Sequence, residues 1–536
     1  MAALCDWIQQ LKSELAAADM RAPVLWRTPP EAVQNQLAQY LPSHTLWLDS
    51  GGPSPLHPPP QALVVKPNQA QHYLGDEYPM LVADGYSGVD ANMLLMLSGT
   101  LKPGGIALIL LPPHCPACAN GALLRYLSLG TDLPRYSPWL ERLMRIPGSL
   151  TMGAPWQLPP PGEPPDPLPP PPRPDKTNVW LITGRRGRGK STLLAALADQ
   201  HPAKTILLVT NHARALRTLQ QHLQQLGWQA ADTTDIPRLW VKEGAETGTR
   251  TLQILPPDAF LQKKPPCQLL LVDEAARLTL PLLSRLLQTP LPMALATTLE
   301  GYEGAGQGLR LKLAQHLPPG RQLKVLVLNH SRRWAANDPL EQWLDALCLL
   351  QTPQPPAPTG EVAIQRWQPH RAEHTLQTAW ALLQSAHYQT RPADLMQLLD
   401  RPDQRLWLAQ AADGVAGVLW ALEEGGLRQA PAHVRGHLAA QRLRQLSGDD
   451  TWLQRRSLRI TRIAVHPRRQ GEGIGSALIE QLKAEADVDF LSVSCAAEPT
   501  LCAFWHKQGF RLIHRGEKPN RASGVPSALF VYDLRT

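Results

Sequence analysis

The chain has 536 residues, of which 43% are apolar and 18% are charged. This composition excludes a disordered tail and a coiled coil, and the length corresponds to roughly three or four domains. Lys and Arg number 53 against 45 Asp and Glu, which gives a formal net charge of +8. A basic surplus favours polyanionic partners over acidic ones.

The first 18 residues are predicted to form an amphipathic helix and not a signal peptide, because they lack a basic segment followed by a pure apolar run. No apolar run approaches the ~18–20 residues that span a bilayer. Seven cysteines are too few for a disulfide scaffold, and the lone C-x-x-C pair Cys115 and Cys118 is a weak zinc or redox signal. We therefore expect a soluble, cytoplasmic protein with no membrane partner, in which these two thiols are reduced.

A proline-rich segment divides the chain. Prolines number 54 in all, and residues 159–174 read PPPGEPPDPLPPPPRP. Such a run forms neither helix nor sheet and is predicted to be a semi-rigid polyproline II spacer. With a second proline-rich patch at 352–359, it predicts an N-terminal domain (1–155), a linker (156–175), a middle domain (176–355) and a C-terminal domain (356–536).

The N-terminal domain alternates apolar strand patterns with helical ones. Buried strands are predicted at residues 45–49, 62–65, 80–83 and 106–111, and helices at 91–101 and 139–145. This alternation predicts an α/β layered domain. It contains no phosphate loop and no recognisable catalytic constellation.

The middle domain opens with a full match to the phosphate-loop pattern G-x-x-x-x-G-K-S/T, from Gly184 through Gly189 and Lys190 to Ser191. A predicted strand (178–182) precedes it and a predicted helix (191–199) follows, which is the context that this motif requires. Lys190 would reach the β- and γ-phosphates, and the Ser191 hydroxyl would ligate Mg²⁺. The motif predicts an ATPase.

An apolar run at 269–272 ends in Asp273 and Glu274. Such a run is typical of a buried parallel strand that delivers carboxylates to the ligand-binding edge of the sheet. Asp273 would hold Mg²⁺ and Glu274 would orient the attacking water. A further strand is expected at 204–210.

Thr297 and Thr298 end another predicted strand and precede a glycine-rich stretch, 301–308. They occupy the place where an ATPase senses the γ-phosphate, although an ordinary loop is an alternative. Arg332 and Arg333 are candidates for an arginine supplied to the phosphates in cis, and a plain surface pair is the alternative. Residues 176–351 have room for about one RecA-like domain, so we expect remodelling of a partner and not processive translocation.

The C-terminal domain contains a strand pattern that ends at Pro467, a glycine loop and an amphipathic helix. The form Gln-x-x-Gly-x-Gly, with Gln470, Gly473 and Gly475, resembles the pyrophosphate loop of the GNAT acetyltransferases. A strand at 490–494 and an F-W-x-x-x-G-F turn at 504–510 follow, as in that fold. The main chain of residues 463–465 would pair with the pantetheine amides, and an N–H near Val465 would stabilise an oxyanion.

Arginines gather just upstream of this loop: Arg435, Arg442, Arg444, Arg455, Arg456, Arg459 and Arg462. A solvated basic face is one interpretation. Beside an acyl-transfer site, we prefer an RNA-backbone patch.

A phosphate-loop ATPase joined to a GNAT module resembles the tRNA(Met) cytidine acetyltransferase (TmcA) family. Blocks at 78–81 with 94–105, 301–308, 332–341, 385–395, 435–438 and 462–467 resemble family blocks, so the similarity spans nearly the whole chain. It implies an α/β multidomain fold with an N-terminal α/β domain, a RecA-like helicase-like ATPase and a GNAT domain. It further implies ATP-dependent acetylation of cytidine N4 in tRNA, at the wobble cytidine of elongator tRNA-Met, with acetyl-CoA, ATP and Mg²⁺.

The resemblance also implies roles for individual residues. The ATP contacts correspond to Gly184, Arg185, Arg186, Gly187, Arg188, Gly189, Lys190, Ser191, Thr192, Leu193 and Arg333, with Asp273 beside them. The acetyl-CoA contacts correspond to Ile463, Ala464, Val465, Gln470, Gly471, Glu472, Gly473, Ile474, Gly475 and Ser476. Thr500 and Lys507 stand where the family has a Glu and an Arg. His387 is the candidate general base, with a structural histidine as the alternative.

Two further departures are visible. The family usually has an adenine-reading glutamine shortly before the phosphate loop, where this chain has the proline-rich linker. Family members commonly have another RNA-binding region beyond the point that corresponds to Thr536. Two other functions remain open: an ATP-driven RNA chaperone whose GNAT domain senses acetyl-CoA, and an ATP-regulated protein N-acetyltransferase.

Overall fold

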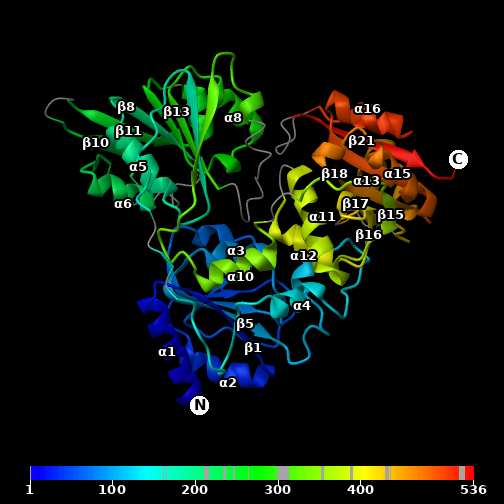
Figure 1. Ribbon diagram of the computed structural model, residues 1–536, viewed down its shortest axis with the longest axis horizontal. Coiled ribbons are helices and arrows are strands. Elements are labelled where there is room, and N and C mark those ends of the chain that lie inside the picture. Colours follow the sequence, from blue (N-terminus) through cyan, green and yellow to red (C-terminus); the bar gives the residue numbers. More distant parts are fainter. Residues whose placement is uncertain are drawn as a thin grey trace.

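The computed structural model describes residues 2–160, 162–163, 166–210, 217–232, 234, 237–244, 248–263, 265–298, 313–351, 355–386, 390–428, 434, 436–517 and 525–535. They form three β-sheets covered by helices, each sheet in its own stretch of the chain. Figure 1 shows the N-terminal sheet at the bottom, the second sheet at the upper left and the third at the right. Within the described residues, no helix is long and apolar enough to cross a membrane.

The N-terminal sheet has six strands in the order β3-β2-β4-β5-β1-β6, all paired in parallel. Its elements are α1 (Ala2–Ala17), β1 (Ala22–Arg27), α2 (Pro30–Tyr40), β2 (Thr45–Leu48), β3 (Ala62–Val65), β4 (Tyr78–Asp84), α3 (Ala91–Ser98), β5 (Leu101–Leu111), α4 (Pro138–Arg145) and β6 (Leu150–Thr151). The four expected strands are confirmed. The helix expected at 91–101 ends at Ser98, because Leu101 already begins β5. Cys115 and Cys118 are buried free thiols, as predicted.

The second sheet has the order β14-β7-β13-β12-β8-β11-β10-β9, and its six strands from β14 to β11 are parallel. Its elements are β7 (Asn178–Gly184), α5 (Lys190–Gln200), β8 (Thr205–Val209), α6 (Arg217–Gln225), β9 (Gln229–Ala230), β10 (Leu239–Lys242), β11 (Arg250–Leu255), α7 (Pro257–Lys263), β12 (Leu269–Val272), α8 (Leu280–Leu287), β13 (Met293–Thr297) and β14 (Gln322–Leu328). The carboxyl ends of parallel strands meet at one edge, so the loops after β7, β12 and β13 share that edge.

The third sheet has the order β15-β16-β17-β18-β19-β21-β20. Its elements are β15 (Ala363–Arg366), α11 (Glu373–Ala386), α12 (Pro392–Asp400), β16 (Gln404–Ala411), β17 (Gly414–Gly425), α13 (Leu438–Ser447), α14 (Thr451–Gln454), β18 (Arg456–Val465), α15 (Ile474–Glu485), β19 (Phe490–Ala496), α16 (Pro499–Lys507), β20 (Arg511–Arg515) and β21 (Ser527–Asp533). Its strands are antiparallel except for the pair β18 and β19.

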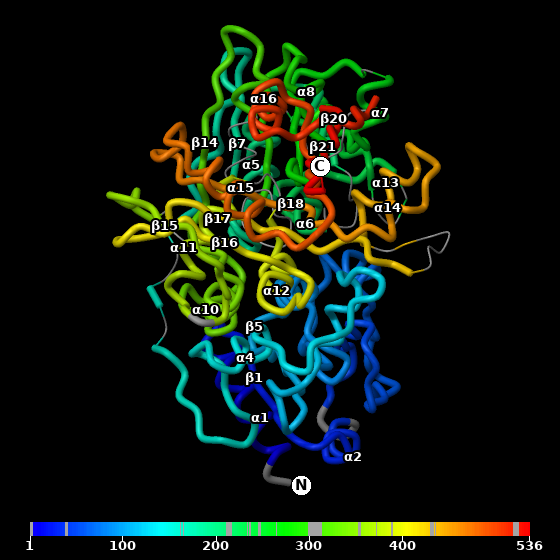
Figure 2. Tube along the Cα trace, turned by 90° about the vertical axis from the view of Figure 1, so that its right-hand side faces the viewer, coloured from blue at the N-terminus to red at the C-terminus, as the bar shows by residue number. Residues whose placement is uncertain are grey.

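One hydrophobic core joins the N-terminal sheet to the third sheet. It runs from Leu46 in β2 to Ala464 in β18 and includes α10 (Pro339–Cys348), α11 and α12. Figures 1 and 2 place α10 and α12 against the N-terminal sheet, although α10 follows the second sheet in sequence. The cores on the two faces of the second sheet are separate. The domain boundaries expected from the sequence stay a prediction, since packing crosses them.

Asp400, at the end of α12, links the N-terminal and C-terminal parts of this joint core by hydrogen bonds. It accepts hydrogen bonds from the N–H of Trp139 at 2.8 Å, the hydroxyl of Ser137 at 2.7 Å and the amide of Asn120 at 3.1 Å. Burial raises the pKa of Asp400 to about 6, although these three donors partly offset the effect. A carboxyl group of the C-terminal part of the chain is thus held entirely by N-terminal donors.

The proline-rich linker contains neither helix nor strand in its described residues, as predicted, but it does more than separate two domains. Trp156 stacks edge-on against Trp7 with ring centroids 5.0 Å apart. Further on, the N–H of Gly162 donates to Oδ1 of Asn337 at 3.1 Å, and Leu168 contacts the phosphate loop at Gly189. Described parts of the linker therefore pack against α1, the segment before α10 and the phosphate loop.

Candidate functional site

The phosphate loop follows β7 and leads into α5, as the motif predicts. Gly187 and Gly189 have φ of 76° and 87°, a left-handed conformation that side-chain-bearing residues rarely adopt. A Cβ on Gly187 would lie 3.1 Å from the Trp334 ring. The loop lines one side of a cavity of about 490 Å³, which is within the usual range for a small-molecule site.

The cavity lies between the second sheet and the N-terminal domain. Residues 185–192 line one side, and Glu77, Leu95 and Gly99 of the N-terminal domain line the other. Leu168 of the linker and His222 of α6 complete the wall. The N-terminal domain is thus part of the candidate nucleotide site, which the sequence did not indicate.

The side chains of the loop differ in what they contact. The ammonium group of Lys190 donates to the carbonyl oxygens of Gly184 at 2.7 Å and Arg185 at 2.9 Å. Ser191 lines the cavity, whereas the Leu193 side chain is buried in the core beneath α5. Leu193 does not line the cavity, and its N–H donates to the carbonyl oxygen of Gly189 at 2.9 Å, so a ligand contact of Leu193 stays a prediction.

Asp273 and Glu274 follow β12, as expected. Asp273 is buried and accepts a hydrogen bond from the N–H of Glu274 at 3.0 Å. Glu274 has a left-handed backbone with φ of 52°, and its buried Oε2 has no hydrogen-bond partner among the described residues. Strain of this kind in a non-glycine residue is concentrated at functional sites, and Glu274 lines the cavity whereas Asp273 does not. The described residues contain no group of three or more His, Cys, Asp or Glu suited to a metal.

The two threonines after β13 have separate environments. Thr297 is fully buried, and its hydroxyl accepts a hydrogen bond from the N–H of Ala276 at 3.0 Å. Thr298 lines the cavity. The glycine-rich stretch 301–308 lies outside the described residues.

Arg332 and Arg333 are bound to other parts of the chain and are not a free surface pair. Arg333 donates to Glu77 at 2.7 Å and to the carbonyl oxygen of Gly99 at 3.0 Å. Arg332 donates through its guanidinium to the carbonyl oxygen of Asp166 in the linker. Burial lowers the pKa of Arg333, and the nearby Arg186 lowers it further. Both arginines line the cavity.

The second candidate site lies where β18 and β19 diverge. A β-bulge at Thr461 bends β18, and its hydroxyl donates to the carbonyl oxygen of Trp420 at 2.9 Å. The β18–β19 pairing ends at Ile460 and Val493, although β18 continues to Val465. The last five residues of β18 therefore have one edge without a neighbouring strand in the described chain.

Along this edge, the N–H and C=O groups of alternate residues point away from β17, toward the side that has no neighbouring strand in the described chain. The N–H of His466 donates to the carbonyl oxygen of Ala416 at 2.9 Å, toward β17. Because facing alternates along an antiparallel ladder, Val465 and Ile463 face away from β17. The Val465 carbonyl oxygen accordingly accepts a hydrogen bond from the side chain of Gln470 at 3.3 Å.

The glycine loop lies beside this open edge. Gly471 and Gly473 have φ of 86° and 85°, and no described atom lies within 4 Å of a Cβ built on either. Gly473 precedes the first turn of α15, whose N–H groups are free to bind an anion. The first turn of α15 is fixed by a hydrogen bond of 2.9 Å from Gln508 to the hydroxyl of Ser476.

The other predicted acetyl-CoA residues have more varied positions. Ile474 is buried in the core, and Glu472 forms an ion pair with Arg469 at 2.5 Å. Thr500 and Lys507 are exposed at the two ends of α16. Sequence similarity alone therefore identifies a loop, while the structure separates its ligand-facing main chain from its packing side chains.

The arginine cluster is not the open basic patch that we preferred. Five of its members pair with carboxylates: Arg444 with Asp450, Arg455 with Asp533, Arg456 with Asp487, Arg459 with Glu424, and Arg462 with Asp394. Except for Asp450, the carboxylates that pair with these arginines are distant in sequence. Arg435 lies outside the described residues.

His387, the candidate general base, also lies outside the described residues. Thr390 is described, and its hydroxyl accepts a hydrogen bond from Arg462 of β18 at 2.8 Å. His387 as the general base therefore stays a prediction.

Three family models match the chain. The tRNA(Met) cytidine acetyltransferase TmcA N-terminal model matches residues 1–120, the RNA cytidine acetyltransferase NAT10/TcmA helicase model matches 181–351, and the acetyltransferase (GNAT) model matches 437–526. Each stretch falls on a different sheet, although the GNAT match leaves out β15, β16, β17 and β21 of the third sheet. They confirm the expected helicase-like and GNAT folds.

Curated relatives are similar over most of the chain. The tRNA(Met) cytidine acetyltransferase TmcA of Pectobacterium atrosepticum is 32% identical over 89% of this chain and 72% of its own length. That of Salmonella typhimurium is 31% identical over 99% of this chain and 79% of its own length. Among solved structures, the ribosomal-protein-S18-alanine N-acetyltransferase from Escherichia coli is 16% identical over 32% of this chain and 94% of its own, with a TM-score of 0.23. The identity and coverage of the relatives show that the chain belongs to the tRNA(Met) cytidine acetyltransferase TmcA family.

Proposed function

We propose that the chain transfers the acetyl group of acetyl-CoA to N4 of a cytidine in tRNA, in a reaction coupled to ATP. The observation that carries this proposal is the edge of β18 at Ile463 and Val465, which has no neighbouring strand in the described chain and lies next to the glycine loop and the start of α15. Membership of the TmcA family supports tRNA as the substrate. We infer further that the target is the wobble cytidine of elongator tRNA-Met.

The open edge fits the extended, amide-bearing arm of acetyl-CoA, and the glycine loop fits its pyrophosphate. Acetyl-CoA supplies an acetyl group activated as a thioester. The chain must orient the N4 amine, because its lone pair is delocalised into the ring and reacts poorly. The N–H of Val465 is the proposed donor to the developing oxyanion, and His387 is the proposed proton acceptor.

The cavity beside the phosphate loop fits a nucleotide. We propose that Lys190 and the loop N–H groups bind its phosphates, that Ser191 and Asp273 hold Mg²⁺, and that Glu274 orients the attacking water. ATP supplies free energy on hydrolysis. A stacked base is inaccessible to the acetyl-transfer site, so we infer that the ATPase opens or seats the anticodon loop.

The test is a transfer assay with total tRNA, acetyl-CoA and ATP, followed by digestion and nucleoside mass spectrometry. We expect N4-acetylcytidine only when both small molecules are present, and its position is then mapped by fragmentation of the tRNA. If no acetylated nucleoside forms while RNA still stimulates ATP hydrolysis, the acetylation proposal fails and the RNA chaperone function takes its place.

A further inference from the structure

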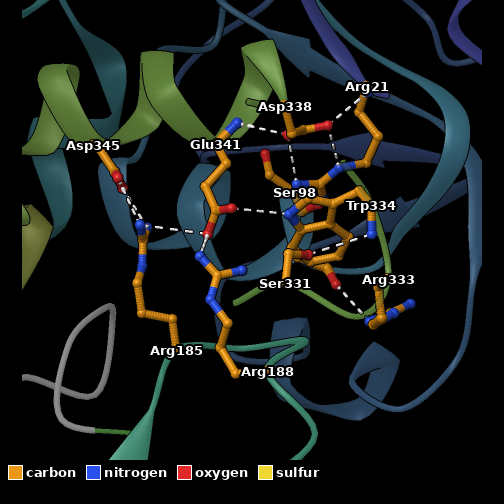
Figure 3. A network of polar contacts seen from close by, with 11 residues as sticks. Arg21, Ser98, Arg185, Arg188, Ser331, Arg333, Trp334, Asp338, Glu341 and Asp345 are labelled. Carbon is orange, nitrogen blue, oxygen red and sulfur yellow. Dashed lines mark hydrogen bonds and ion pairs between the residues drawn. The ribbon is translucent and has the colours of Figure 1, made fainter. Parts of the chain in front are cut away.

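Two arginines of the phosphate loop are balanced by carboxylates from outside the second sheet (Figure 3). Arg185 donates to Asp345 at 2.5 Å, and its guanidinium lies 3.4 Å from Glu341. Arg188 donates to the same Glu341 at 2.9 Å. The second oxygen of Glu341 accepts a hydrogen bond of 2.9 Å from the indole of Trp334. Glu341 is therefore the shared partner of this network.

The carboxylates belong to α10, and α10 is anchored to the N-terminal domain at both ends. At its start, Asp338 caps the helix, and its carboxylate forms an ion pair of 2.9 Å with the guanidinium of the buried Arg21. At its end, Arg142 of α4 donates to the carbonyl oxygens of Ala346 at 2.6 Å and Leu347 at 2.8 Å. We therefore expect α10 and the N-terminal domain to move together.

The second sheet is attached differently. Its two hydrophobic cores contain buried residues from Val179 to Leu328 only, whereas α10 shares a core with the N-terminal and third sheets. Contacts between the phosphate loop and α10 are ion pairs. Polar interfaces within a chain permit relative motion more readily than a shared apolar core.

Glu341 can act as a full anion in this network. Burial acts to raise its pKa, but the neighbouring Arg185 and Arg188 hold the pKa below its usual range. Its side chain is only 11% exposed, so the ion pairs are poorly screened by solvent.

We propose that Glu341 is the positioning residue that couples occupancy of the phosphate loop to the body formed by the N-terminal and third sheets. With no phosphate in the loop, the carboxylates of α10 serve as counter-ions for Arg185 and Arg188. A nucleotide phosphate competes for the same guanidinium groups, so nucleotide binding loosens the loop from α10. By linkage, the contact with α10 lowers nucleotide affinity by the same factor.

This inference rests on the proposed function only in taking ATP as the ligand. The test is the change Glu341→Gln, which keeps an oxygen for Trp334 but removes the charge. With Mg²⁺ and a non-hydrolysable ATP analogue, we expect the Kd to fall roughly fivefold or more. In hydrogen exchange, we expect the analogue to accelerate exchange of the α10 amides in the original chain and to have no such effect in the variant.

The matched control is Glu423→Gln, which breaks an ion pair with Arg405 between β16 and β17, away from the loop and from α10. Its Kd should not change. Asp345→Asn is the second variant, because Asp345 is more exposed than Glu341 and its loss is easier to accommodate. An unchanged or higher Kd in both α10 variants, Glu341→Gln and Asp345→Asn, overturns the inference. Absence of acetyl transfer with normal analogue binding overturns only the proposed function, whereas absence of analogue binding overturns both.

Discussion

Arg142 of α4 donates through Nε to the carbonyl oxygen of Leu347 at 2.8 Å, although the two residues are 205 positions apart. The carbonyl groups of a last helical turn have no partner within the helix. Here a buried guanidinium from another domain supplies that partner. The end of α10 is thus satisfied by tertiary structure in addition to a local cap, in which the N–H of the left-handed Leu349 donates to the carbonyl oxygen of Asp345.

The change Arg142→Ala should destabilise the protein. It leaves two buried carbonyl oxygens without their donor, which costs roughly 2–4 kcal/mol in unfolding free energy. Thermal unfolding followed by circular dichroism would report this as a lower midpoint. Arg142→Lys restores the charge but not the forked geometry and should recover only part of the loss; an unchanged midpoint in the alanine variant would show that the contact is dispensable.

The change Lys190→Ala should reduce ATP hydrolysis roughly 100-fold, because one preorganised cation is removed from the phosphates. Acetyl-CoA binding should remain unchanged, because the proposed acetyl-CoA site lies between β18 and β19, which belong to a different sheet from β7 before the phosphate loop. Phosphate release and calorimetric titration with acetyl-CoA measure the two effects. Equal loss of both would indicate a folding defect instead.

The change Gly475→Glu should weaken acetyl-CoA binding roughly tenfold or more, because it places a carboxylate at the proposed pyrophosphate site. Gly475→Ala is the control. A Cβ there meets Phe504 and Val465 at 3.6 Å and 3.7 Å, which are ordinary contacts. If the glutamate variant binds acetyl-CoA as the original chain does, the loop is not the pyrophosphate site.

Asp400 should make stability depend on pH. Its pKa in the folded chain is about 6, above the ~3.9 of an unfolded aspartate, so the neutral form is favoured by folding. The stability it contributes is present below about pH 4 and is lost as pH rises through 6, by on the order of 3 kcal/mol. In urea unfolding between pH 4 and 7, the free energy of unfolding of an Asp400→Asn variant should therefore increase relative to that of the original chain as pH rises. A constant difference would contradict the assignment.

Local patterns predicted much of the fold. The strands at 62–65 and 178–182 and the loops at Gly189 and Gly473 could be located because glycine spacing and apolar runs act within a few residues. The positions of α10 and Glu77 could not, because they depend on packing between segments hundreds of residues apart. The arginine cluster was misjudged for the same reason: the carboxylates that neutralise it, such as Glu424 and Asp533, come from other elements.

The joint core has a consequence for synthesis. Its members extend from Leu46 to Ala464, so the ribosome delivers the first of them long before the last. Until α10, α11 and α12 emerge, the N-terminal domain presents to the cell the apolar face that they will later cover. Contacts this far apart in sequence form slowly, and the nascent chain is exposed to aggregation in the interval. The joint core can therefore be completed only after Ala464 has been translated.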